Sequence, residues 1–406
     1  MSISKTLPWP ISILLGLALI STACAPLSSS DSRPAETMAE SPRNAVDTEP
    51  PVPLEEEMAE ELTVSEPEET VAQEMEELQA LGPWTEASTE PGRETGVEYD
   101  FPVTTNKQVE FYLDFFQNKQ RRTFSRWLAR SGRYLPMIQS QLKEAGLPLD
   151  LAYLPMIESG YSLTAYSRSS AVGPWQFMKP TARHFGLTIN QYVDERRDPV
   201  KSTRAAIKYL TYLYEDFDCW LLAVAAYNAG EGKIRWASRK AGSDNFWELS
   251  HHLHLETKRY VPKLMAAIII ARDPAKFGFD EVVYEAPLEF ETVEVPPWTQ
   301  LEAVAAACET DLETLRNLNR QLRQGMTPPK QAHYPLKVPK GKSAVVAQNL
   351  PRVRPILSTR YKTHTVQGRE SLAQVCRQYN LNKLTLLRAN NLRSTQLKAG
   401  QQLRIP

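Results

Sequence analysis

The chain has 406 residues, more than one domain usually contains, and its hydrophobic share of 42% is enough to build globular cores. The near-neutral net charge of −1 gives no reason to expect a nucleic-acid partner, but it conceals an asymmetry. Residues 31–100 hold 21 acidic residues against three arginines, which leaves +17 for the rest of the chain. Thirty prolines exclude one uninterrupted helical array. Four widely spaced cysteines without a CxxC pair exclude a disulfide-stapled miniprotein and a cysteine-rich zinc module.

Residues 1–24 follow the order of a secretory signal peptide: a positive charge, an apolar run over residues 11–20, then small residues before Cys24. The run is short for a membrane-spanning helix, so an uncleaved anchor is the minor alternative. The sequence ISTAC resembles a bacterial lipobox, although Ser21 stands where a large aliphatic residue is usual. The resemblance implies a periplasm-facing lipoprotein that is lipidated at Cys24 and, with Ala25 next, directed to the outer membrane. Plain cleavage near this site is the alternative.

Residues 25–104 form an acidic segment that is rich in Pro, Ser, Thr and Glu and poor in aromatic residues. Such a composition buries too little apolar surface to offset the entropy of ordering the chain, so we expect a disordered linker. Some helical spacing between Glu55 and Leu81 allows a transient helix. The linker would give the rest of the chain reach from a membrane.

Residues 105–282 are predicted to form a mainly helical domain, because apolar residues recur there at helical spacing, as in Val109, Tyr112 and Phe116. Within it, Glu158 lies in a short predicted helix, on the same face as Leu151 and Leu154. A carboxyl group among apolar side chains has a raised pKa and can serve as a general acid near neutral pH. A buried salt bridge or a helix-end hydrogen bond is the ordinary alternative for such a carboxylate.

Four motifs follow one another in this domain. They are Glu158-Ser159, Gly173-Pro174-Trp175-Gln176-Phe177-Met178, Ala226-Tyr227-Asn228-Ala229-Gly230, and Tyr260. In this order they resemble the lytic transglycosylases whose catalytic domain is similar to goose-type lysozyme. The resemblance implies a mainly α, lysozyme-like catalytic domain. Pro174 departs from the family pattern, which usually has an aliphatic residue or Met at this position.

The resemblance also implies the reaction and the site. The enzyme would cleave the β-1,4 bond between N-acetylmuramic acid and N-acetylglucosamine, with Glu158 acting first as acid and then as base. The sugar's own C6 hydroxyl would attack C1 and leave a 1,6-anhydromuramoyl end. Substrate-binding residues would be Ser159, Gly173, Gln176, Phe177, Met178, Tyr227, Asn228, Gly230 and Tyr260. Trp175 and Phe177 are candidates for stacking on sugar rings. For Trp175 and Tyr227 packing in the core, and for Gly230 a helix C-cap, are the ordinary alternatives.

Neither a metal nor another cofactor is expected. The cluster His251, His252, His254 and Glu256 lacks HExxH spacing, and surface histidines are the more common explanation. The charged loop at Asp194, Glu195 and Asp198 also contains Arg196 and Arg197, which indicates salt bridges and not a catalytic pair of carboxylates.

The C-terminal third contains a repeat in which residues 290–319 align with 361–390, and each copy reads strand, helix, helix, strand. The second copy, residues 360–406, resembles a LysM domain, a βααβ module that binds N-acetylglucosamine-containing glycans. The first, residues 288–340, is a degenerate LysM-like module, because Pro296-Pro297 replaces the glycine after its first strand. Residues 341–359 are expected to link the two.

The partners implied are peptidoglycan glycan strands and, through the lipid anchor, a membrane, with the protein as a monomer. Peptidoglycan carries carboxylates, so a basic body suits long-range attraction to it. Two rival functions are a non-catalytic peptidoglycan-binding lipoprotein and a hydrolysing muramidase. The second would need another carboxylate in the cleft.

Overall fold

The computed structural model describes residues 68–82, 84, 97–358, 362–368, 370–379, 381, 383–390, 392 and 394–405. The predicted signal peptide and Cys24 lie outside these residues, as does most of the predicted linker. Within the described ranges, no helix is both long enough and apolar enough to cross a membrane.

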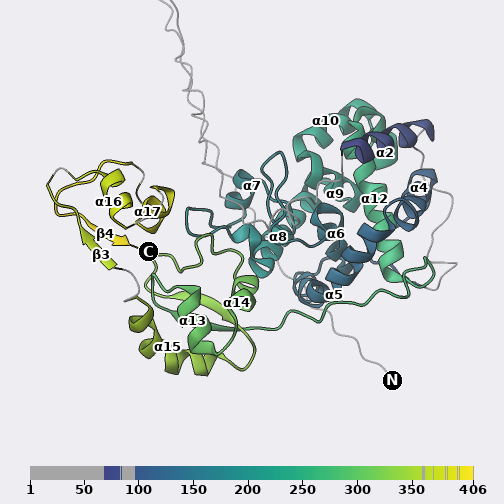
Figure 1. Cartoon of the computed structure of the whole chain (residues 1–406). Helices are drawn as coiled ribbons and strands as arrows, with labels where there is room; N and C mark the ends of the chain where they lie inside the picture. The colour runs from purple at the N-terminus through teal and green to yellow at the C-terminus, as the bar shows by residue number, and fades with distance from the viewer. Residues whose placement is uncertain are drawn as a thin grey trace, which may run out of the picture. The chain divides into compact units, whose positions relative to one another are not determined.

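The expected helical domain is present between residues 107 and 272 (Figure 1). Its α-helices are α4 (Lys107–Gln117), α5 (Arg121–Glu144), α6 (Leu154–Ser159), α7 (Lys179–His184), α8 (Pro199–Phe217), α9 (Trp220–Ala229), α10 (Glu231–Ala241), α11 (Phe246–Leu249) and α12 (Leu255–Arg272). Three short 3-10 helices join them: η1 (Leu149–Tyr153), η2 (Glu195–Arg197) and η3 (Ser250–His252).

Helix α12 is the central element of this domain and packs against α4, α6 and α9. Twelve of its 18 residues are buried, including Tyr260 and the apolar run from Leu264 to Ile270. A helix that is apolar on all sides must be surrounded by protein. Because α6 is one of its neighbours, α12 brings Tyr260 next to the end of the helix that carries Glu158.

Within the predicted linker, the structure differs from the expectation of disorder, because Glu68–Ala80 forms helix α2. Its Leu78 is fully buried in the core of the helical domain. Its Glu74 is also buried, pairs with Arg259 at 2.5 Å and accepts a hydrogen bond from the Tyr112 hydroxyl. The expectation of disorder rested on the average composition of the segment. It overlooked Glu74 and Leu78, which are four residues apart and therefore lie on the same face of a helix.

The two C-terminal modules have the expected βααβ order. The first contains β1 (Glu291–Val295), α13 (Leu301–Cys308), α14 (Leu312–Leu318) and β2 (Tyr334–Val338), and the second contains β3 (Lys362–Thr365), α16 (Leu372–Gln378), α17 (Lys383–Ala389) and β4 (Gln402–Ile405). Each pair of strands is antiparallel, with Val293 opposite Leu336 and His364 opposite Leu403. Each module has its own apolar core.

The structure corrects the prediction that residues 341–359 only link the two modules. Most of this segment forms helix α15 (Ser343–Ser358), which packs on α13 and β1. Val346 and Leu350 are four residues apart, lie on one face of the helix and are buried in the core of the first module. That helical spacing was visible in the sequence.

Candidate active site

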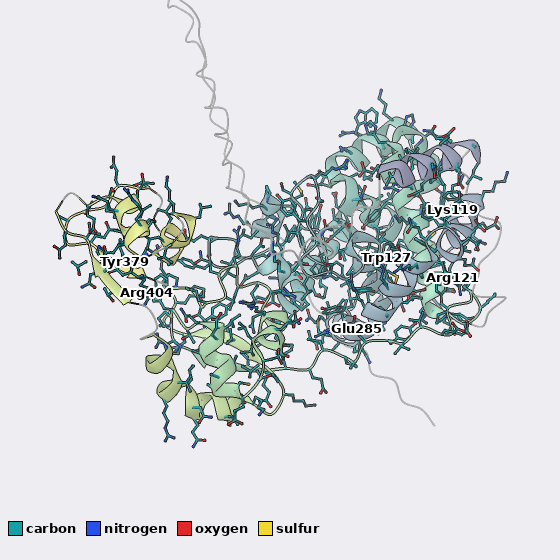
Figure 2. The ribbon with its side chains drawn as sticks, viewed as in Figure 1. Lys119, Arg121, Trp127, Glu285, Tyr379 and Arg404 are labelled. Atoms are coloured by element: carbon teal, nitrogen blue, oxygen red, sulfur yellow. The ribbon has the colours of Figure 1, made fainter. Side chains whose placement is uncertain are left out.

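Glu158 is the penultimate residue of α6, and Gly160 caps the C-terminal end of this helix. Gly160 adopts the left-handed conformation (φ 55°) that closes a helix, which favours glycine. A Cβ atom at Gly160 would lie 2.2 Å from the indole of Trp127 on α5 (labelled in Figure 2). The close approach of α5 and α6 therefore requires glycine at this position and holds the end of α6 in place.

The electrostatic environment of Glu158 suits an acid that works near neutral pH. Burial raises the pKa of its carboxyl from the usual 4.5 to about 7. A hydrogen bond of 2.5 Å from the Tyr260 hydroxyl and the charge of Lys263 act in the opposite direction. The charge of Glu256, at the start of α12, raises this pKa slightly further. The carboxyl group can thus hold a proton and also survive as a carboxylate once the proton has left.

The loop at residues 173–178 lies beside Glu158 because two of the predicted site residues hold its backbone. The Ser159 hydroxyl donates to the carbonyl of Pro174 at 2.9 Å, and the Tyr227 hydroxyl donates to the carbonyl of Trp175 at 2.8 Å. Tyr227 lies in the last turn of α9, and the pKa of its hydroxyl is raised by burial and by the charge of Glu158. Ser159 therefore holds the loop against α6, which carries Glu158, and Tyr227 holds it against α9.

Gly173 lies where this loop meets the charged loop before α8. Its φ of 83° favours glycine, and a Cβ atom there would lie 2.0 Å from the carbonyl oxygen of Arg196. The reason for glycine is thus contact between two protein segments. Gly230, with φ 87°, makes the turn between α9 and α10, and no atom lies within 4 Å of a Cβ built there. Its role is the C-cap that we considered as the ordinary alternative.

Four other predicted substrate contacts lie in two environments. Trp175 and Phe177 are 0% and 3% exposed, so neither ring offers a face for stacking on a sugar. For Trp175, the alternative of packing in the core fits the structure. Phe177 packs edge-on against Tyr227. Asn228 is exposed at the end of α9, and Met178 is 42% exposed at the start of α7. The two exposed side chains are free to meet a ligand.

Gln176 is directed towards its own loop. Its backbone has φ 45°, and its side-chain amide donates to the carbonyl of Gly173 at 2.8 Å. In the structure the amide N–H stabilises the loop, and the predicted hydrogen bond to the sugar would use the other end of the side chain.

Sequence reasoning missed Lys263, a buried residue one turn after Tyr260 whose charge lowers the pKa of Glu158. The helical spacing of three residues was the available signal. The charged loop does contain the expected salt bridge, between Arg196 and Asp194 at 2.7 Å. Among the described residues, no three His, Cys, Asp or Glu side chains are grouped so that they could hold a metal ion.

Comparison with known families identifies the domain that contains Glu158, the loop at residues 173–178 and Tyr227. Residues 136–250 match the family described as Transglycosylase SLT domain. The chain carries a transglycosylase SLT domain. Residues 289–355 match the family described as Lytic transglycosylase MltD, LysM-like domain, and residues 364–406 match the LysM domain. The first LysM-type match includes most of α15, in agreement with the packing of that helix.

The chain is also similar to individual known proteins. The chain is 30% identical over 292 residues to membrane-bound lytic murein transglycosylase D of Escherichia coli K12, covering 68% of this chain and 64% of that protein. It is 40% identical over 107 residues, 26% of this chain and 52% of that protein, to a putative tributyltin chloride resistance protein of an Alteromonas species. A solved structure, the 70 kDa soluble lytic transglycosylase of Escherichia coli, is 18% identical with a TM-score of 0.34, covering 54% of this chain and 45% of that one.

Proposed function

We propose that the protein is a peptidoglycan lytic transglycosylase that remodels the cell wall. It cleaves the β-1,4 bond between N-acetylmuramic acid and N-acetylglucosamine without water as the nucleophile. The observation that carries this proposal is the environment of Glu158. A single carboxyl group with a pKa near 7 accepts a hydrogen bond from a buried tyrosine, and it lies within an SLT domain.

The reaction needs one group that first gives and then takes a proton. Protonated Glu158 transfers its proton to the glycosidic oxygen as the bond to C1 of the muramic acid breaks. The resulting carboxylate removes the proton from the C6 hydroxyl of the same sugar, whose oxygen bonds to C1 and closes the 1,6-anhydro ring. Glu158 ends protonated, as it began. Tyr260 and Lys263 stabilise the carboxylate between the two steps.

The other residues of the site have separate roles. Ser159 and Tyr227 hold the loop at residues 173–178 beside Glu158. The exposed Asn228 and Met178 are the residues we assign to direct contact with the glycan.

The remaining parts of the chain would bring the SLT domain to its substrate. The catalytic domain would extend over residues 105–282, and the two LysM-type domains would bind glycan strands, which raises the effective concentration of the polymer. Lipidation of Cys24 would anchor the protein, as a monomer, in the outer membrane with its domains in the periplasm. The relative of Escherichia coli is named as membrane-bound, which supports this placement.

A hydrolysing muramidase is the second candidate, and Glu256 is the residue that would make it possible. Hydrolysis through a paired mechanism needs a second carboxylate. Glu256 is exposed at the start of α12, and its charge acts on Glu158. The hydrogen bond to the Glu158 carboxyl comes from Tyr260 and not from Glu256, which favours the mechanism with one carboxylate.

One experiment separates the candidates. The purified chain is incubated with murein sacculi, and the soluble fragments are analysed by mass spectrometry. Products lighter by one water than hydrolytic ones, without reducing ends, are expected for the wild type and for Glu256→Gln. Glu158→Gln should release nothing while still pelleting with sacculi. Reducing ends that disappear in Glu256→Gln would establish the muramidase instead, and intact sacculi retained by the wild type would establish a binding protein.

A further inference from the structure

The loop at residues 188–198 of the SLT domain contacts the first LysM-like domain, residues 289–355. Val193 forms an antiparallel bridge with Leu322, and both residues are buried in the core of the LysM-like domain. The backbone N–H of Asp194 donates to the carbonyl of Gln321, at 2.9 Å. The backbone N–H of Arg323 donates to the carbonyl of Tyr192, also at 2.9 Å. The contact thus uses backbone hydrogen bonds and apolar burial together.

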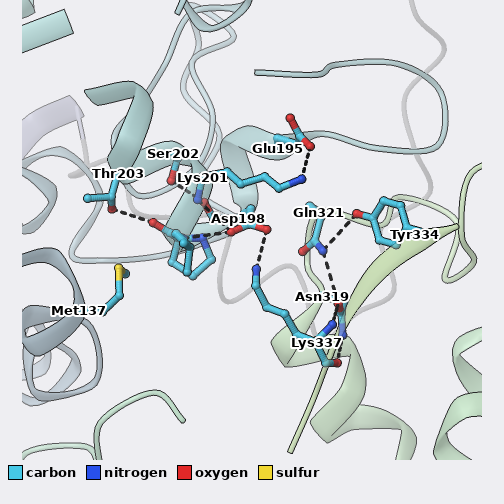
Figure 3. Close-up of polar contacts among 12 residues, drawn as sticks. Met137, Glu195, Asp198, Lys201, Ser202, Thr203, Asn319, Gln321, Tyr334 and Lys337 are labelled. Atoms are coloured by element: carbon cyan, nitrogen blue, oxygen red, sulfur yellow. Dashed lines mark hydrogen bonds and ion pairs between the residues drawn. The ribbon is translucent and has the colours of Figure 1, made fainter. Parts of the chain in front are cut away.

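A buried ion pair lies at the centre of this contact (Figure 3). The Lys337 ammonium group on β2 lies 2.5 Å from Oδ2 of Asp198, and the two side chains are 9% and 2% exposed. Burial lowers the pKa of Lys337, and the charge of Asp198 opposes that effect. Because isolated buried charges are costly, each of these residues depends on the other.

The second LysM domain shows that the LysM fold does not itself bury this position. Asn319 binds the backbone of Lys337 in both directions, its amide donating to the Lys337 carbonyl and its oxygen accepting from the Lys337 N–H. Asn390 binds the backbone of Arg404 in the same two ways. Arg404 therefore occupies the equivalent position, and it is exposed (Figure 2). The burial of Lys337 comes from its contact with the SLT domain.

From Asp198, a series of hydrogen bonds leads to the active site. Asp198 caps α8, its Oδ1 accepting from the backbone N–H groups of the first turn. On the next turn, Thr203 accepts a hydrogen bond from the indole N–H of Trp175 at 2.9 Å. The carbonyl of Trp175 in turn accepts from the hydroxyl of Tyr227 at 2.8 Å. The ion pair thus holds the end of the helix that anchors Trp175.

A second connection runs through Arg196. Both side-chain oxygens of Asp194 bind the Arg196 guanidinium, which donates to the carbonyls of Ser170 and Phe177 at 3.1 Å. Ser170 and Phe177 lie on the two sides of Gly173, whose backbone contacts the Arg196 carbonyl. The backbone N–H of Asp194 is bound by Gln321 of the LysM-like domain. The connection through Asp198 and the connection through Arg196 therefore both lead from the loop at residues 169–178 to that domain.

We propose that Lys337 is a positioning residue for the active site, and that the first LysM-like domain acts as a support for the loop at residues 169–178. The expected effect of Lys337 on turnover rests on the proposed function. Its effect on the loop is independent of that function. The domain therefore contributes to kcat as well as to glycan binding, because displacing the loop displaces the groups around Glu158.

The test compares two lysine variants of the full chain. Lys337→Met removes the buried charge, and the matched control Lys340→Met removes an exposed lysine of the same domain that pairs with Glu289 at 2.9 Å. For Lys337→Met, kcat on soluble glycan strands should fall about tenfold or more, with KM and pelleting on sacculi unchanged. Amide hydrogen exchange over residues 169–178 should rise. Lys340→Met should resemble the wild type in both measurements.

Two further variants keep the test decisive if Lys337→Met does not fold. Lys337→Arg retains the charge, on a strand position where the second LysM domain already has an arginine, and should restore most of the lost kcat. Asp198→Asn keeps a capping oxygen for α8 but removes the opposite charge, and it should increase exchange over the loop. Wild-type kcat and wild-type exchange in Lys337→Met or Asp198→Asn would overturn the inference. Failure of the wild type to cleave sacculi would refute the proposed function, and exchange would still decide the inference.

Discussion

Replacing Glu158 with glutamine is expected to abolish cleavage and, at pH 8, to stabilise the fold. The pKa of Glu158 is about 7 in the folded chain against the usual 4.5, so the unfolded chain loses this proton first as pH rises. The free energy of unfolding therefore falls as the pH rises from about 4.5 to about 7, and it stays at the lower value above pH 7. At about 1.4 kcal/mol for each pKa unit, burial of the charge costs at most about 3 kcal/mol at alkaline pH. Glutamine carries no charge, and its oxygen can still accept the hydrogen bond from Tyr260.

The assay is urea denaturation of the wild type and of Glu158→Gln at pH 4 and pH 8. The difference in unfolding free energy between the two proteins should be near zero at pH 4 and should favour the variant by about 2–3 kcal/mol at pH 8. Other groups that titrate in this range, such as Asp150, contribute equally to both proteins and cancel. Glu285→Gln, which removes an exposed carboxylate 3.5 Å from Arg133, should show no such difference. An equal pH dependence in the wild type and in Glu158→Gln would refute the assignment of a partly buried, proton-retaining carboxyl group.

Three more outcomes follow from the contacts of the site and of α2. Tyr260→Phe removes the hydrogen bond that lowers the pKa of Glu158, so the alkaline limb of the kcat/KM profile should move up by about one pH unit; a downward shift would contradict this. Gly173→Ala places a Cβ atom 2.0 Å from the Arg196 carbonyl and should cost at least about 2 kcal/mol by thermal unfolding. Glu74→Ala removes the buried carboxylate of α2, so amide exchange over that helix should rise at least about tenfold, and unchanged exchange would show that α2 does not depend on it.

The sequence allowed the helical domain and the apolar face around Glu158 to be predicted, because both depend on neighbours close in the chain. Tyr260, which donates a hydrogen bond to Glu158, lies 102 residues further along the chain. The helical spacing of Val109, Tyr112 and Phe116 corresponds to α4, whose buried side chains include all three. The apolar residues around Glu158 indicated the raised pKa that the structure shows. Such patterns are local, and local spacing determines which face of a helix is buried.

Contacts between distant parts of the chain could not be predicted in this way. The charged loop was expected to form salt bridges, and it does, but Asp198 pairs with Lys337, which lies 139 residues further along the chain. Glu74 of α2 pairs with Arg259, 185 residues away. A single sequence shows that charges exist, whereas the partner of a buried charge depends on how the domains pack.

The departures of the first LysM-like domain from the LysM pattern have a physical explanation in its contact with the SLT domain. Pro296-Pro297 replaces the glycine of the second copy, and the next residue, Trp298, adopts φ 58°. The Trp298 ring packs edge-on against Tyr192 of the SLT domain, with the ring centroids 5.8 Å apart. The segment that replaces the glycine of the second copy thus contacts the same loop as β2, which carries Lys337. The replacement of glycine by Pro296-Pro297 weakens the resemblance to LysM, and it lies where the first copy contacts the SLT domain. Such a change is expected if this copy supports the active site.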